Sequence, residues 1–161
     1  MRRWVLLLVL GWASVVPVAA QKAGQASAAK KQVIPGFTLK NTNASPKGVV
    51  EQSVDAFNNN AKMFLLIAPE GTRSNATEWK RGFYHIASGA QVPILPAACD
   101  YQKKIITFGP AVMPCGDYAE DLRTILEFYR DFGVARHPDR MSKPVCDIKG
   151  MEWKPSSSKD D

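Results

Sequence analysis

The chain has 161 residues, close to the roughly 150 of one domain. This length predicts a single domain with extensions and argues against a two-domain enzyme. Hydrophobic residues make up 45% and charged residues 22%, as in globular proteins, and the 11 glycines and 11 prolines show no period typical of a fibre. The net charge of +6 favours anionic partners, namely phosphates, acidic lipid surfaces or nucleic acid.

Residues 1–20 are predicted to form an apolar leader. Arg2 and Arg3 precede an apolar run that ends in small residues at Ala20, a pattern that resembles a secretory signal. The run is short for a spanning helix of about 20 apolar residues, so a shallow membrane anchor is the alternative. Residues 21–45 are rich in alanine, glutamine and lysine and are predicted to be a linker.

The next elements alternate between helix and strand. Ser45 and Pro46 are typical of a helix start, and apolar residues follow at helical spacing as far as Phe57. Residues 63–68 (MFLLIA) form a continuous apolar run, which predicts a strand buried on both faces in a parallel sheet. A second helix is expected over residues 83–90.

Two further strands and a helix complete the predicted domain. Residues 92–98 are apolar but carry two prolines, so they predict a short or edge strand, and residues 105–108 predict another strand. Asp117 can cap an amphipathic helix that closes near Gly133. The order of elements indicates an α/β layer fold over residues 46–133, with a mostly parallel or mixed central sheet.

The remaining residues, 134–161, are polar and without periodicity, and we expect mostly disorder in this tail. Three cysteines lack the C-x-x-C spacing of a zinc or redox site, so we interpret all of them as free thiols and expect no metal. They are Cys99, Cys115 and Cys146.

The loop after residues 63–68 carries the residue types of a phosphate site. In open α/β sheets, ligands bind at the carboxyl ends of the strands. Gly71 allows close approach of a ligand, Arg73 can bind a phosphate with two hydrogen bonds, and Thr72 and Ser74 add hydroxyl donors. Glu70 could orient the arginine or a substrate hydroxyl. The alternative is a polar turn with a surface Glu–Arg pair.

Three sequence blocks in order resemble the glycerolipid acyltransferase superfamily, which includes the 1-acylglycerol-3-phosphate and glycerol-3-phosphate acyltransferases. They are IAPEGTRS at residues 67–74, KRGF at 80–83 and VPILP at 92–96. The resemblance implies transfer of a fatty acyl chain from acyl-CoA or acyl carrier protein to a glycerol phosphate, in phospholipid biosynthesis. It implies acceptor and phosphate binding by Glu70, Gly71, Thr72, Arg73 and Ser74, and a pocket shaped by Lys80, Gly82 and Pro96.

The chain departs from the superfamily at the catalytic pair. These enzymes carry a histidine followed after four residues by an aspartate, where histidine acts as the base for the acceptor hydroxyl. Here His85 is followed at the fifth position by Ala90, and His137 by Ser142. The resemblance therefore names no catalytic residue and implies a partial domain. Two hypotheses follow: an acyltransferase that could be inactive as written, and a non-catalytic homologue that binds lipid phosphates.

The resemblance also predicts partners and location. We expect a lysophospholipid or glycerol phosphate acceptor, an acyl thioester donor as co-substrate and no other cofactor. Nucleic acid is not expected, since no clustered basic helix or aromatic stacking motif is present. Acyl thioesters are cytoplasmic, so we expect membrane association at the cytoplasmic face, with secretion after a cut at Ala20 as the alternative.

Overall fold

The computed structural model describes residues 5–10, 48–72 and 75–155, the first of these as backbone alone. The helices expected from apolar spacing are present as α1, α2 and α3. In chain order the elements are β1 (Val5–Leu10), α1 (Val49–Asn59), β2 (Met63–Ile67), α2 (Gly82–Ala90), β3 (Ile94–Asp100), β4 (Ile105–Phe108), α3 (Tyr118–Asp131), the 3-10 helix η1 (Pro138–Arg140) and α4 (Lys143–Lys149).

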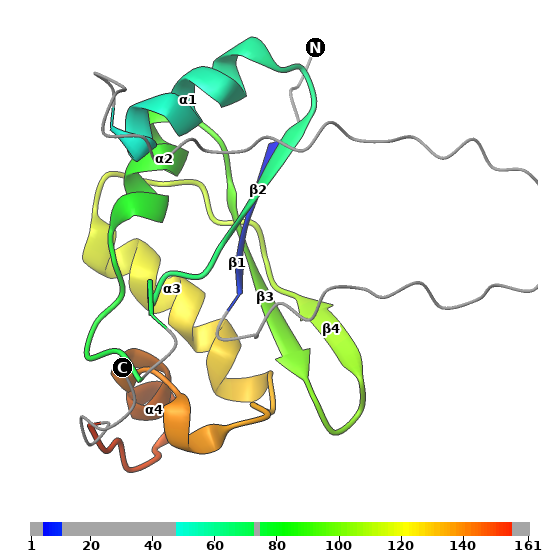
Figure 1. The fold of residues 1–161 in the computed structure, drawn as a ribbon, viewed down its shortest axis with the longest axis vertical. Helices are drawn as coiled ribbons and strands as arrows, with labels where there is room; N and C mark the ends of the chain where they lie inside the picture. The colour runs from blue at the N-terminus through cyan, green and yellow to red at the C-terminus, as the bar shows by residue number, and fades with distance from the viewer. Residues whose placement is uncertain (1–4, 11–47, 73–74, 156–161) are drawn as a thin grey trace, which may run out of the picture.

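In the described part of the chain, four strands form one sheet in the order β2-β1-β3-β4. β1 pairs in parallel with both neighbours, with Leu7 opposite Leu65 on β2 and opposite Ile94 on β3. β4 pairs with β3 in the antiparallel sense, with Thr107 opposite Ala98. Figure 1 shows α1, α2 and α3 on the same side of this sheet. The protein is therefore of the mixed α/β class, as the sequence predicts.

The inner strand β1 is formed by residues that were predicted to belong to the apolar leader. A short apolar run suits an inner strand as well as a signal or an anchor, so the pattern alone does not distinguish them. In the structure residues 5–10 lie between β2 and β3. The rest of residues 1–20 and the linker at 21–45 lie outside the described residues, and a cut after Ala20 stays a prediction.

β2 is a strand, as predicted, but the prediction that both of its faces are buried is wrong. Met63, Leu65 and Ile67 pack against the core, whereas Phe64 is 56% and Leu66 44% exposed. β2 lies at the edge of the sheet, and its exposed side chains alternate with the ones that face the helices. A continuous apolar run does not show how many faces of a strand are covered.

The predicted edge position of residues 92–98 is also wrong, because β3 lies between β1 and β4. Pro96 is fully buried and has no N–H to donate. Its carbonyl oxygen nevertheless accepts a hydrogen bond from the Gly109 amide at 2.8 Å. Pro96 therefore removes one N–H donor from the hydrogen bonds of the sheet, while its carbonyl oxygen still accepts one.

The predicted helix cap at Asp117 is confirmed. Its carboxylate accepts the amide N–H groups of Ala119 at 2.9 Å and Glu120 at 3.2 Å, which satisfies donors at the start of α3. The apolar stripe of α3 buries Ile125 and Tyr129 against the sheet. None of the helices in residues 48–72 and 75–155 is long and apolar enough to cross a membrane.

The tail is ordered over much of its length, so the expectation of disorder is wrong for residues 134–155. This segment forms η1 and α4, and α4 packs on α3. α4 has seven residues, too few to show a clear helical period, and tertiary packing stabilises it. Its segment buries Met141, Ser142, Val145 and Cys146.

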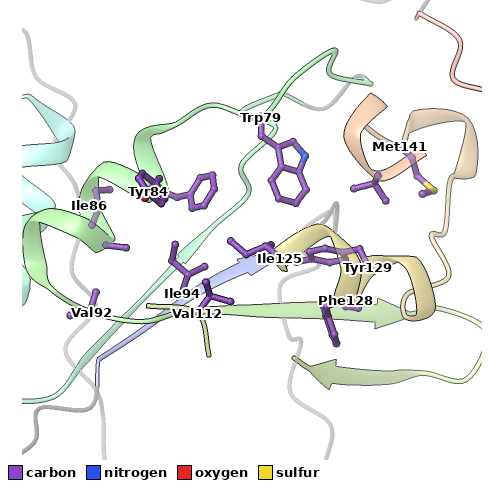
Figure 2. Close-up of a cluster of buried hydrophobic side chains, with 14 of the residues drawn as sticks. Trp79, Tyr84, Ile86, Val92, Ile94, Val112, Ile125, Phe128, Tyr129 and Met141 are labelled. Atoms are coloured by element: carbon purple, nitrogen blue, oxygen red, sulfur yellow. The ribbon is translucent and has the colours of Figure 1, made fainter. Parts of the chain in front are cut away.

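The hydrophobic core lies between the helices and the covered face of the sheet. Figure 2 shows Trp79 facing Ile125 and Tyr129, with Met141 of the tail beside them. The rings of Trp79 and Tyr129 meet edge to face, with centroids 5.8 Å apart. The residues just after the Glu70–Ser74 loop are therefore anchored in the same core that holds the tail.

Candidate functional site

The loop that carries the candidate residues begins directly after β2. Gly71 donates its amide to the Ala68 carbonyl at 3.2 Å and adopts the left-handed conformation with φ of +64°. This conformation is the reason for a glycine at the turn. The amide of Lys80 donates to the Pro69 carbonyl at 2.7 Å and closes the loop. Arg73 and Ser74 lie outside the described residues, so their predicted phosphate contacts stay predictions.

Glu70 lies in the interior, with 2% of its surface exposed. Its Oε1 accepts a hydrogen bond from Ser142 Oγ at 3.3 Å. The same hydroxyl accepts the indole N–H of Trp79 at 2.9 Å, so a chain of hydrogen bonds runs from indole to hydroxyl to carboxylate. Ser142 and Trp79 are buried as well. The described contacts therefore join Glu70 to the tail. Its predicted contact with the acceptor stays a prediction.

The other side of the loop is also joined to the tail. The side-chain amide of Asn75 donates to the carbonyl oxygens of Asp139, at 3.4 Å, and Lys154. The amide of Lys143 donates to the Ala76 carbonyl at 2.8 Å. Backbone groups of the tail therefore fix the residues that follow Ser74, just as Ser142 fixes the residue that precedes Gly71.

An apolar cleft of about 440 Å³ lies beside the loop, between α1, β2 and α2. This volume falls within the range of small-molecule sites. Of the predicted pocket residues, Lys80 and Gly82 line the cleft, whereas Pro96 does not. The full lining comprises Val49, Val50, Leu65, Leu66, Ile67, Ala68, Pro69, Lys80, Gly82, Phe83 and Ile86.

A second cavity, of about 30 Å³, lies beside Glu70 and is also lined by residues of β3, α3 and the tail. It is large enough for a single water molecule. Cys99 and Lys149 both line it, and burial raises the pKa of the Cys99 thiol and lowers the pKa of the Lys149 ammonium. Lys149 Nζ donates to the Arg130 carbonyl at 3.4 Å and the Phe132 carbonyl at 3.1 Å, so this lysine caps the end of α3.

Neither histidine lines the apolar cleft. His85 lies on the exposed face of α2, and His137 is partly buried just before η1. Among the described residues, no three histidine, cysteine, aspartate or glutamate side chains gather into a group that could hold a metal ion. The three cysteines are free, as the sequence predicts.

Sequence reasoning missed Ser142, Trp79 and Asn75, whose side chains connect the loop to the tail. One local signal was available for Ser142: it is a serine two residues before Pro144, a pattern typical of a helix start. No local signal pairs it with Glu70, because the two residues are 72 positions apart.

The sequence model of the acyltransferase family matches residues 8–100. The match begins within β1 and ends with β3, and it includes the loop and the apolar cleft. No curated protein and no solved structure matches the chain. The match supports an acyltransferase function in general, with an acyl donor and an acyl acceptor as substrates. The chain belongs to the acyltransferase family, within the glycerolipid acyltransferase superfamily.

Proposed function

We propose that this protein transfers a fatty acyl group from acyl-CoA or acyl carrier protein to a lysophosphatidate-like glycerol phosphate, in phospholipid biosynthesis. The proposed setting is the cytoplasmic face of a membrane, where the donor thioester and the acceptor lipid meet. The net charge of +6 supports attraction to an anionic lipid surface. We further propose that the strands described above belong to the layered fold of the glycerolipid acyltransferases.

The observation that carries this proposal is the position of the apolar cleft. Its lining includes Ala68 and Pro69, so the cleft reaches the start of the Glu-Gly-Thr-Arg segment. Lys80 adds a positive charge at that end. A ligand with an apolar chain and an anionic head group matches such a site, because the chain would be removed from water while phosphate oxygens meet cationic and hydroxyl donors.

In the proposed reaction the acceptor hydroxyl oxygen attacks the thioester carbonyl carbon. The C–S bond breaks, the thiolate leaves, and the hydroxyl proton passes to a base and from there to the sulfur. Arg73 and Thr72 would hold the acceptor phosphate so that its hydroxyl faces the thioester. No histidine lines the cleft. Without a positioned base the rate is expected to fall roughly 10²–10⁴-fold, so we expect slow turnover.

Turnover by the full chain tests the proposal. The purified protein is incubated with an acyl-CoA and lysophosphatidate, and phosphatidate is measured by mass spectrometry. Arg73→Ala should abolish product formation, whereas Arg123→Ala, an exposed arginine on α3, should leave it unchanged. Absence of product at high enzyme concentration, or equal loss in both variants, would refute the acyltransferase proposal.

A non-catalytic lipid-phosphate-binding protein is the second candidate. It is favoured by the absence of an aspartate at the fifth position after either histidine, His85 or His137. Calorimetric titration with short-chain lysophosphatidate distinguishes the candidates: binding that Arg73→Ala weakens, without turnover in the assay above, supports this second function. Absence of binding by the wild-type protein overturns both.

A further inference from the structure

Besides its own backbone bond from Lys80 to Pro69, the loop between β2 and α2 is held on both sides by hydrogen bonds to the tail. Asp139, Lys143 and Lys154 contribute backbone groups, and Ser142 contributes its side chain. We call these residues, Asp139, Ser142, Lys143 and Lys154, the clamp. The clamp lies outside residues 8–100, so it is not part of the matched family domain.

Ser142 is the clamp residue whose side chain is most tightly constrained by its surroundings. Its side chain is 1% exposed and lies between Trp79, which is 4% exposed, and Glu70, which is 2% exposed. A buried carboxylate is costly unless donors face it, and the Ser142 hydroxyl is such a donor. The hydroxyl is therefore fixed in orientation: it accepts from the indole and donates to the carboxylate.

We propose that Ser142 is a positioning residue that, through Glu70, holds the loop in the conformation that receives the acceptor phosphate. This inference rests on the proposed function. Glu70 directly precedes Gly71 and Thr72, so a displaced carboxylate shifts the backbone that presents the proposed phosphate donors. At the other end Asn75 is held by two carbonyl oxygens of the clamp, so both flanks of the segment are fixed.

A purely structural role of α4 in the core is the competing explanation. Val145 is buried in the same helix, at 6% exposure, but its side chain makes no hydrogen bond to the loop. Val145→Ala therefore lowers stability while leaving every donor and acceptor of the clamp in place. It is the matched control for Ser142→Ala.

The experiment uses the full chain and two measurements on each variant. Calorimetry gives the affinity for short-chain lysophosphatidate, and amide hydrogen exchange reports how often the Lys80 N–H to Pro69 bond opens. Ser142→Ala should weaken affinity and accelerate exchange at Lys80, each about tenfold, since a buried hydrogen bond to a charged group is lost. Ser142→Thr keeps the hydroxyl and should restore both values.

Asn75→Ala breaks the clamp at its more exposed end, so it tests the inference even if Ser142→Ala does not fold. It should change affinity and exchange in the same direction as Ser142→Ala. Val145→Ala should lower the melting temperature while the affinity stays at the wild-type value.

The inference is overturned if Ser142→Ala binds like the wild type, or if Val145→Ala weakens binding as much as Ser142→Ala does. If the wild type binds no lysophosphatidate, the proposed function fails on its own. The rate of amide hydrogen exchange at Lys80 then tests separately whether the clamp holds the loop. Faster exchange in Ser142→Ala and Asn75→Ala supports this role of the clamp, and unchanged exchange refutes it.

Discussion

Replacing Gly71 by alanine tests whether the loop depends on its left-handed turn. Gly71 has φ of +64°, where an L-residue with a Cβ costs roughly 1–2 kcal/mol. A Cβ built there would lie 3.2 Å from Lys80 Cγ, tighter than ordinary contact. Lys80 is exposed and flexible, so this contact is relieved by moving its side chain away from the position it holds at the end of the cleft.

The net effect on stability follows from two opposing contributions. Alanine restricts the unfolded chain and offsets about 0.4–1 kcal/mol of the strain, so the free energy of unfolding should fall by about 1 kcal/mol. Gly71→Asn should lose less, because asparagine tolerates the left-handed region. Gly82→Ala is the matched control: no atom lies within 4 Å of its added Cβ, and alanine at this first position of α2 should not lower stability.

Urea denaturation followed by tryptophan fluorescence measures these differences. The dependence of the unfolding free energy on urea should be the same in all variants, since the folded structure is kept. Lysophosphatidate affinity should decrease in the order wild type, Gly71→Asn, Gly71→Ala. If Gly71→Ala is as stable as the wild type, or if Gly71→Asn is the less stable of the two, the turn does not have the strain assigned to it.

Burial, and then the hydrogen bond to Asp121, raise the pKa of the Tyr84 phenol, so the contribution of Tyr84 to stability should be constant below about pH 10 and be lost as the pH rises through the raised pKa. Urea denaturation against pH checks this, and Tyr84→Phe should flatten the decline. Cys115 is exposed and should be the first of the three thiols to react with a disulfide reagent; a fast phase that survives Cys115→Ser would contradict this. Ile106 is 59% exposed, so Ile106→Thr should reduce self-association in sedimentation without loss of stability.

The elements that sequence reasoning predicted correctly are those with a local cause. Asp117 caps α3 because its carboxylate reaches amides two and three residues later, and such a signal is readable from the sequence alone. At Gly71 the sequence predicted close approach of a ligand, with a polar turn as the alternative, and the structure shows a turn with a left-handed glycine.

The errors come from features that depend on distant residues. The sequence does not show that β1 lies between β2 and β3, and that arrangement decides that β2 is an edge strand and β3 an inner one. Arg73 and Ser74 were proposed from their residue types and from the resemblance, and both lie outside the described residues. The role of Ser142 was invisible for a similar reason, because a serine in a polar tail has no local pattern that pairs it with Glu70.

The loop and the clamp lie far apart in the sequence, and this separation has a consequence for protein synthesis. The hydrogen bonds between them join residues 63 to 79 positions apart. At roughly 5–20 residues per second, Glu70 is added to the growing chain about 4–14 seconds before Ser142 is. In the later part of that interval the nascent chain already contains residues 8–100 but not yet Ser142, the hydrogen-bond partner of Glu70. The loop of the acyltransferase domain can therefore take its final conformation only after the segment beyond that domain has been translated.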